Sequence, residues 1–270
     1  MTPIEAAVKA IAGADALLIT AGAGMGVDSG LPDFRGNEGF WQAYPPIAKL
    51  GLSFSEMAQS RWFSDDPAFA WGFYGHRLRL YREAVPHLGF ALLLGAARNM
   101  PGGYFVVTSN VDGQFQKAGF DPLRINEIHG SIHHLQCTKL CRKKLWSADH
   151  VQVNIDLETF RAKSPLPICP ECGETARPNI LMFSDPAWVS HRANDQEGVF
   201  GNWLDSLTGK RLVIIECGAG TAIPSIRSIS SQIIRRFDAT LIRINPREIT
   251  VPDGHIAIEA GALDGLSAIL

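Results

Sequence analysis

Three residues with side chains suited to acid–base and polar chemistry come soon after two predicted strands. Asn110 and Asp112 follow the apolar run at 104–107, which predicts a buried strand. His129 follows residues 124–128, which we expect to form a further strand. Polar residues at the carboxyl ends of parallel strands lie over the ligand crevice of the sheet, so the three side chains could converge there. A histidine with a near-neutral pKa at that edge could act as a general base, although each residue alone could equally be a structural cap.

A glycine-rich stretch follows another short apolar run. Residues 16–19 predict a buried strand, and the stretch at 22–36 comes next in the chain. A strand that leads into a glycine-rich turn can bring backbone N–H groups to a pyrophosphate. The usual dinucleotide fingerprint is G-x-G-x-x-G, and Val27 stands where its third glycine would be. The sequence therefore indicates a dinucleotide site through a motif that departs from the usual pattern.

Four of the five cysteines form two close pairs. Cys137 and Cys141 make up one pair, Cys169 and Cys172 the other, and 27 residues separate them. Four thiolates satisfy tetrahedral zinc and leave no open position, so this spacing predicts a structural zinc ribbon. The alternative is two reduced or disulfide-linked pairs without metal. The fifth, Cys217, is expected to be a buried apolar residue.

Composition and charge restrict the class of protein. The chain has 270 residues, 46% of them hydrophobic, with 25 basic residues against 27 acidic ones. This near balance argues against bulk binding to nucleic acid or to an anionic membrane. We see no apolar run long enough to span a membrane and no secretory signal. We expect an intracellular, cytoplasmic enzyme.

The order of predicted elements indicates the fold. Strands and helices alternate, and this predicts an α/β protein with a Rossmann-like, doubly wound parallel sheet. Besides the runs named above, we expect helices at 3–12 and 86–98, a helix capped by Asp66, and strands at 180–183, 212–215 and 240–244. A smaller inserted domain would consist of a helical segment and the zinc ribbon. We divide the chain into a Rossmann domain at 1–36, 78–130 and 178–270, a helical insertion at 37–77 and a zinc-binding module at 131–177.

Two segments carry a resemblance to a known family. Residues 22–36 read G-A-G-M-G-V-D-S-G-L-P-D-F-R-G, which resembles the first signature of the sirtuins, the NAD-dependent protein deacylases: G-A-G-x-S-x-x-S-G-I-P-x-F-R-G. Residues 108–119, T-S-N-V-D-G-Q-F-Q-K-A-G, are similar to the family's T-Q-N-x-D-x-L-H-x-x-A-G, which is followed by a strand ending in H-G. Ser109 replaces the family glutamine. The resemblance extends from residue 16 to about residue 262, and sirtuins carry a four-cysteine zinc module at this place.

The resemblance implies a fold and a reaction. NAD would lie between a large and a small domain, with an acyl-lysine entering opposite it. Asn110 and Asp112 would line the nicotinamide pocket, and Phe34 and Arg35 would close over the nicotinamide and its ribose. The acyl oxygen would attack the ribose C1′, nicotinamide would leave, and His129 would deprotonate a ribose hydroxyl. The products would be lysine, nicotinamide and O-acyl-ADP-ribose.

Position within the family motifs also implies binding residues. Residues 177–185, R-P-N-I-L-M-F-S-D, resemble the family's R-P-x-V-V-x-F-G-E strand, which pairs with the substrate peptide, so Leu181 and Phe183 are expected to contact the substrate. Ser184 and Asp185 replace the family Gly and Glu. The expected cofactor contacts are Gly22, Ala23, Gly24, Phe34, Arg35, Ser109, Asn110, Asp112, Gly218, Ala219, Gly220 and Asn245.

A Tyr/Arg pair indicates the acyl group. Tyr74 and Arg77 are three residues apart, so both project from one face of a helix. A guanidinium beside a phenol can bind a carboxylate. The pair resembles the Y-x-x-R of desuccinylase and demalonylase sirtuins, and Ala58 falls where that class keeps a small residue. The alternative is a core tyrosine beside a solvated arginine, with plain deacetylation as the activity.

The sequence leaves other functions open. The same scaffold could transfer a single ADP-ribosyl group or hydrolyse NAD, because Ser109 and Ser184 depart from the family pattern. The chain could also be an NAD-responsive binding module without catalytic activity, but the intact Asn110, Asp112 and His129 argue against this. A zinc ribbon that binds nucleic acid is a further alternative, and the balanced charge argues against that one.

Overall fold

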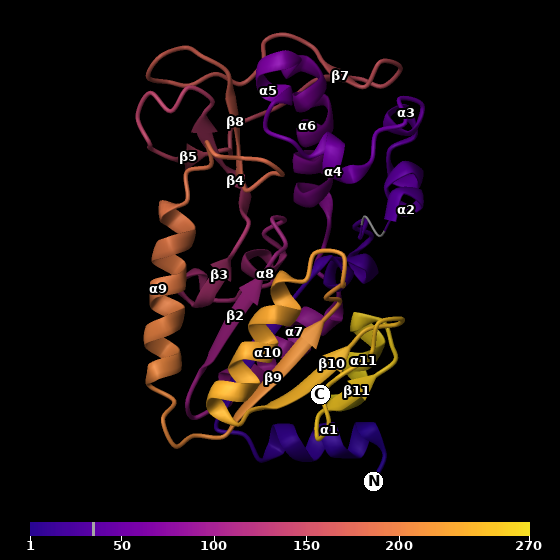
Figure 1. The fold of residues 1–270 in the computed structure, drawn as a ribbon, viewed down its shortest axis with the longest axis vertical. Coiled ribbons are helices and arrows are strands. Elements are labelled where there is room, and N and C mark those ends of the chain that lie inside the picture. Colours follow the sequence, from indigo (N-terminus) through magenta and orange to yellow (C-terminus); the bar gives the residue numbers. More distant parts are fainter. Residues whose placement is uncertain (34–35) are drawn as a thin grey trace.

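Six parallel strands form the sheet of the larger of two lobes (Figure 1), in the order β11-β10-β9-β1-β2-β3. Their bounds are β1 (Ala16–Ala21), β2 (Tyr104–Thr108), β3 (Ile125–Glu127), β9 (Leu212–Cys217), β10 (Thr240–Ile244) and β11 (Ile256–Ile258). The chain builds outward from β1 to β3 and then returns to build outward from β9 to β11. The strand order therefore reverses between β1 and β9, where open parallel sheets bind their ligands. The computed structural model describes residues 1–33 and 36–270, so the predicted contacts of Phe34 and Arg35 lie outside the described residues.

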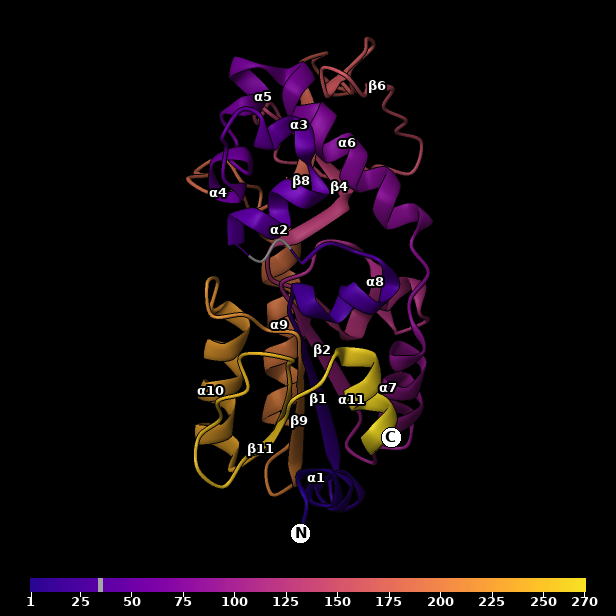
Figure 2. The same cartoon turned by 90° about the vertical axis from the view of Figure 1, so that its right-hand side faces the viewer.

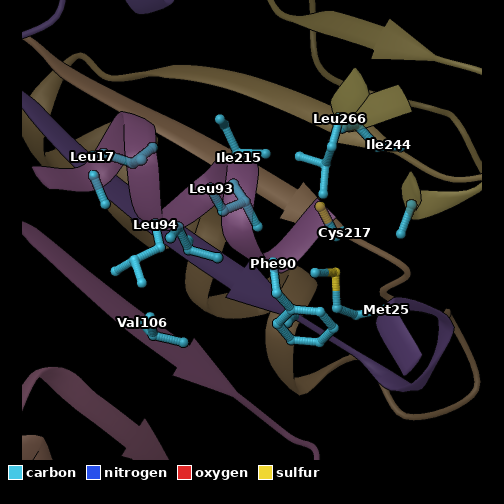
Figure 3. Close-up of a cluster of buried hydrophobic side chains, with 14 of the residues drawn as sticks. Leu17, Met25, Phe90, Leu93, Leu94, Val106, Ile215, Cys217, Ile244 and Leu266 are labelled. Carbon is cyan, nitrogen blue, oxygen red and sulfur yellow. The ribbon is translucent and has the colours of Figure 1, made fainter. Parts of the chain in front are cut away.

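Helices cover both faces of this sheet (Figure 2). The first face packs against α1 (Pro3–Ala12), α7 (Leu88–Arg98), α8 (Gln114–Lys117) and α11 (Ala262–Ile269), and the second against α9 (His191–Asp205) and α10 (Ser225–Phe237). Successive strand residues point to opposite faces, so Leu17 packs with α7 and Leu18 with the other layer. Figure 3 shows part of the first layer, in which Phe90, Leu93 and Leu94 of α7 belong to one buried cluster with Leu17 of β1 and Ile215 of β9. None of the helices in the described ranges has both the length and the apolar character needed to cross a bilayer.

The smaller lobe combines helices with short antiparallel strands. Its helices are α2 (Gly36–Ala43), α3 (Pro45–Ala48), α4 (Phe54–Met57), α5 (Trp62–Asp65) and α6 (Pro67–Glu83). Its strands are β4 (Gly130–Cys137), β5 (Trp146–Ser147) and β8 (Ala176–Ile180), in the order β5-β4-β8, with a separate pair formed by β6 (Ile155–Asp156) and β7 (Arg161–Ala162). Trp71 and Phe73 of α6 share one core with Ile132 and Leu135 of β4. The helical segment and the cysteine-bearing segment therefore fold as one unit.

The structure confirms the predicted fold class. The helix predicted at 3–12 has those bounds, and the Asp66 carboxylate accepts the Phe69 N–H at 3.2 Å to cap α6. The domain division stays a prediction; the boundary placed between residues 77 and 78 falls inside α6. Two 3₁₀ helices complete the larger lobe, η1 (Ala23–Ser29) after β1 and η2 (Pro122–Arg124) before β3.

One predicted strand lies elsewhere. The run at 180–183 was expected to be a strand of the parallel sheet, but the strand is β8, at 176–180, and it pairs antiparallel with β4 in the smaller sheet. Past β8, the Leu181 N–H donates to the His129 carbonyl and the Phe183 N–H to the Ala58 carbonyl. The apolar run therefore leaves the sheet. Hydrophobicity alone did not identify the strand, because buried Arg177 and Asn179 make up part of it.

A buried ion pair lies between two strands of the parallel sheet. Glu216 of β9 is 0% exposed and Arg243 of β10 is 4% exposed, and Arg243 Nη2 lies 3.3 Å from a Glu216 carboxylate oxygen. Arg243 also donates to the Thr250 carbonyl. Such a pair adds little net stability compared with apolar residues, but removing one partner leaves the other charge buried and uncompensated.

We therefore predict that Arg243→Met lowers the free energy of unfolding by about 3–5 kcal/mol, measured by urea denaturation. The double substitution Glu216→Leu/Arg243→Met should recover most of that loss, because it leaves no charge unpaired. A double variant as unstable as Arg243→Met alone would contradict this account.

Candidate active site

A cavity of about 560 Å³ opens at the carboxyl ends of β1, β2 and β9, between the two lobes. The larger lobe contributes the loops that follow these strands, and the smaller lobe contributes residues of α6 and the segment after β8. Of the residues predicted from the sequence, those that line the cavity are Gly22, Ala23, Gly24, Tyr74, Arg77, Ser109, Asn110, Asp112, His129, Leu181, Phe183, Gly218, Ala219 and Gly220. The topology thus brings together residues that lie nearly 200 positions apart in the chain.

The loop after β2 is fixed by hydrogen bonds to the end of β1. Thr108 Oγ1 donates to the Ala21 carbonyl at 3.1 Å and accepts the Asn110 N–H at 3.0 Å. Asn110 Nδ2 donates to the Gly22 carbonyl at 3.0 Å. These bonds hold Asn110 and Ser109 at the cavity wall beside the glycine-rich turn.

Asp112 lies deeper in the same wall. Its side chain is 8% exposed, and one carboxylate oxygen accepts the Gln114 N–H at 2.9 Å. Burial raises the pKa of this carboxyl to about 6, because the charged form loses its hydration, while the hydrogen bond from Gln114 acts in the opposite direction. Asp112 is therefore a carboxyl whose charge changes near neutral pH.

His129 reaches the cavity from the turn between β3 and β4. Gly130, the next residue, has φ of +78°, and a Cβ at this position would lie 2.1 Å from the Asn179 carbonyl oxygen of β8. Only glycine fits this crossing, which places His129 between the two sheets. Burial lowers the pKa of the imidazole, with an opposing contribution from the Ser109 backbone. The neutral form, which can accept a proton, therefore dominates at neutral pH.

The glycines of the two central loops allow the loops to touch. The Gly22 N–H donates to the Cys217 carbonyl, and the Gly24 N–H donates to the Gly218 carbonyl. Gly218 has φ of +62°, and a Cβ there would lie 2.3 Å from the carbonyl carbon of Gly24. The amides of Gly22 and Gly24 thus join the loops to each other. Glycine is needed at position 218 because the two backbones are in close contact there.

Asn245 does not line the cavity. It is 0% exposed, and its Nδ2 donates to the Ala219 carbonyl at 3.0 Å. Its Oδ1 accepts the N–H groups of Arg247 and Glu248. The side chain predicted to contact the cofactor is used to hold the loop after β9 in place.

The smaller lobe contributes a charged group surrounded by aromatic rings. Arg77 of α6 is 6% exposed, and its Nε and Nη2 donate to the Tyr81 hydroxyl at 3.0 and 2.7 Å. Its guanidinium lies 5.3 Å from the ring centroid of Phe73 and 5.7 Å from that of Tyr74. Tyr74, Arg77 and Tyr81 line the same cavity, together with the small residue Ala58. The predicted Tyr/Arg pair therefore faces the cavity.

The segment after β8 forms the opposite rim. Leu181 and Phe183 are 39% and 38% exposed. Buried Arg177 pairs through Nη2 with both carboxylate oxygens of Asp185, at 2.9 and 2.8 Å, and this pair closes the loop. Ser184, which stands where the resembled motif has glycine, has φ of +52°.

The four paired cysteines meet at the far end of the smaller lobe. Their Sγ atoms all lie within 4.8 Å of one another. Cys137 is 3.6 Å from Cys172, and Cys141 is 3.6 Å from Cys169. A disulfide needs about 2.05 Å, whereas zinc with four thiolates at about 2.3 Å places its sulfurs about 3.8 Å apart. The arrangement fits a tetrahedral metal and contains no disulfide among these four cysteines.

The sequence patterns did not indicate one residue of the cavity wall, Tyr81, or the support that His87 gives to η1 outside the cavity. Tyr81 lies four residues after Arg77 on α6, and the helical period alone could have placed it on the same face. His87 bridges two elements: its Nδ1 accepts the Gly89 N–H at 3.0 Å, and its Nε2 lies 2.9 Å from the Met25 carbonyl of η1. No sequence pattern indicated that second partner, because it comes from 62 positions away.

Comparison with known proteins agrees with this geometry. A family model described as the Sir2 family matches residues 22–196. The chain is 27% identical over 278 residues to the NAD-dependent protein deacylase of Thermus thermophilus, a match that covers 100% of this chain and 95% of that protein. The structure of a Sir2 homolog–NAD complex superposes with a TM-score of 0.73 at 25% identity, covering 98% of this chain and 91% of that one. A Sir2 homologue triple mutant bound to 2′-O-acetyl ADP ribose gives a TM-score of 0.71 at 25% identity, with 98% and 94% covered.

The raised pKa of Asp112 has a consequence for stability. The folded chain holds the Asp112 proton up to about pH 6, whereas the unfolded chain releases it near pH 4, so this group lowers stability as the pH rises between those values. We predict that Asp112→Asn, which keeps an acceptor for Gln114, raises the free energy of unfolding at pH 7.5 by up to about 3 kcal/mol. Urea denaturation should show the gain shrinking toward pH 4.5. A gain that does not change with pH would contradict the assignment.

Proposed function

Because this chain belongs to the Sir2 family, we propose that it is an NAD-dependent protein deacylase that removes acyl groups from lysine side chains. The observation that carries the proposal is the convergence of Asn110, Asp112 and His129 on one cavity beside the paired glycine loops. These residues come from two strand ends, and their types and order match the motifs of the family. The relative from Thermus thermophilus bears the name of this activity.

In the proposed reaction, the acyl oxygen of the modified lysine attacks C1′ of the nicotinamide ribose. The bond between C1′ and nicotinamide breaks, and nicotinamide leaves with the bonding electrons. His129 removes a proton from a ribose hydroxyl, whose oxygen attacks the resulting imidate carbon. With one water molecule consumed, the products are lysine, nicotinamide and O-acyl-ADP-ribose.

The residues of this chain have separable roles in that scheme. The neutral imidazole of His129 is the base, because burial disfavours its protonated form. Asn110 and Asp112 form the cavity wall at the end that would hold nicotinamide. The apolar walls exclude water from a cationic, oxocarbenium-like centre that water would otherwise trap. Ser109 is shorter than the glutamine of the family motif, so Asn110 and Asp112 would make more of the contacts to the ribose.

We further propose that the acyl group carries a carboxylate, as in succinyl- and malonyl-lysine. Arg77 places a buried guanidinium on the cavity wall, and the small side chain of Ala58 lines the same cavity. A buried cation attracts an anionic group more strongly than an exposed one, since less water screens it. Acetyl-lysine would fit the same cavity without meeting that charge.

The cysteine cluster is proposed to hold one structural zinc ion. Cys137, Cys141, Cys169 and Cys172 would be its ligands, and four thiolates leave no position for substrate. A bound zinc ion would cross-link β4 to the turn before β8 and would take no part in acyl transfer. Cysteines that bind a metal rather than form disulfides also fit our prediction of a cytoplasmic location. The partners that we propose are acylated proteins, and not nucleic acid or membrane.

For the zinc site, we predict about one zinc ion per purified chain and a large loss of zinc in Cys172→Ser, measured by elemental mass spectrometry. The melting temperature should fall with it, because the ion organises a polar segment. Cys217→Ala is the matched control, since Cys217 is buried in the parallel-sheet core. Wild-type protein without zinc, or Cys172→Ser with a full complement, would contradict the proposal.

For the activity, we predict nicotinamide release from NAD that depends on acyl-lysine peptide and yields O-acyl-ADP-ribose, followed by mass spectrometry. His129→Ala should lower the rate about 10²–10⁴-fold. Arg77→Met should lower turnover of succinyl- and malonyl-lysine peptides more than that of acetyl-lysine peptide. Mass added to the peptide or protein would instead indicate ADP-ribosyl transfer. An unchanged acyl preference in Arg77→Met would overturn the carboxylate proposal alone.

A further inference from the structure

Tyr81 lies beside the charged end of the cavity, and no motif discussed above includes it. It follows Arg77 by four residues and Tyr74 by seven, so all three lie on one face of α6. Its hydroxyl oxygen accepts two N–H groups of Arg77, at 3.0 and 2.7 Å. Two bonds to one oxygen fix the plane of the guanidinium, and the Tyr81 ring, 5.3 Å from its centre, packs against it.

Among the residues that the structure describes, two phenolic hydrogens beside this guanidinium have no acceptor. The Tyr81 oxygen accepts from Arg77, but no described backbone or side-chain group accepts the hydrogen that Tyr81 itself carries. The Tyr74 hydroxyl is buried and has no partner of either kind among the same residues. Tyr74 and Tyr81 are 1% and 5% exposed, so bulk water does not freely replace the missing partners. A buried hydroxyl without a partner is costly, so a ligand in the cavity that supplied acceptors would remove this cost.

The missing partner must supply acceptors and negative charge. Burial raises the pKa of Tyr74 to about 12 and raises that of Tyr81, so both phenols keep their hydrogens at neutral pH and act as donors. A carboxylate offers two oxygens with about four acceptor positions, enough for two phenols and a guanidinium. The methyl end of an acetyl group offers none. The donors therefore select an acyl group that ends in a carboxylate.

We propose that Tyr81 is a specificity-determining residue, which orients Arg77 through two hydrogen bonds and donates its own hydroxyl hydrogen to the terminal carboxylate of the acyl-lysine. Tyr74, seven residues before Tyr81 on α6, donates its own hydroxyl hydrogen to the same carboxylate. The Tyr81 carbonyl accepts Gln114 Nε2 at 3.1 Å, which ties this part of α6 to the loop that carries Asp112. This inference rests on the proposed function, since it concerns the acyl end of the same substrate.

The test is Tyr81→Phe, which keeps the ring against Arg77 and removes only the hydroxyl. We expect kcat/KM for succinyl- and malonyl-lysine peptides to fall about 10–100-fold, as for the loss of a hydrogen bond to a charged group, with most of the change in KM. For acetyl-lysine peptide we expect a clearly smaller loss of kcat/KM, because its methyl end meets neither donor, so the ratio of succinyl to acetyl turnover should fall. A purely structural role would lower all three together.

Tyr104→Phe is the matched control, because its hydroxyl accepts the Asp121 N–H at 3.1 Å and lies in β2, away from the cavity. It should leave the ratio of succinyl to acetyl turnover unchanged. An unchanged ratio in Tyr81→Phe, or an equal loss for every acyl group, would overturn the role of Tyr81 while leaving the deacylase intact. A wild-type protein that turns over no acylated peptide would instead overturn the proposed function itself.

Discussion

The contact between the loops after β1 and β9 is the constraint on which the rest of the site depends. The Gly24 N–H donates to the Gly218 carbonyl, and neither loop could come so close with a Cβ at Gly218. Because the strand order reverses between these strands, the chain leaves the sheet in opposite directions on either side of them. The crevice forms there, and Asn110 and Asn245 hold its walls by bonding the same two loops.

The smaller lobe positions the cavity wall that carries Arg77 by packing rather than by hydrogen-bonded strands alone. Trp71 and Phe73 anchor α6 in a core shared with β4, and this fixes the helix face that carries Arg77. The cysteine cluster fastens the far end of β4 to the turn before β8. The proposed acyl specificity and the proposed zinc site thus both depend on the smaller lobe.

Function and stability oppose each other at this site. Asp112 is buried although its charge costs free energy there, and the Tyr74 hydroxyl is buried with no partner in the described part of the chain. Apolar residues of similar shape would make both positions more stable. Their presence is understandable if a bound substrate supplies the missing interactions, because binding energy then offsets what folding loses. The Glu216–Arg243 pair differs, since both partners are satisfied within the sheet.

The sequence alone determined the α/β class, the cysteine cluster and the polar residues at the strand ends. These follow from local patterns: burial favours apolar runs of fixed period, and ligand spacing follows from metal geometry. Only the tertiary structure decided that β8 pairs with β4, that Asn245 supports a loop and that Tyr81 holds Arg77. A local pattern records which residues favour burial or a given backbone shape. Which distant partner each residue contacts depends on the packing of the whole chain. Several pairings compete, and the native fold is the combination with the lowest total free energy.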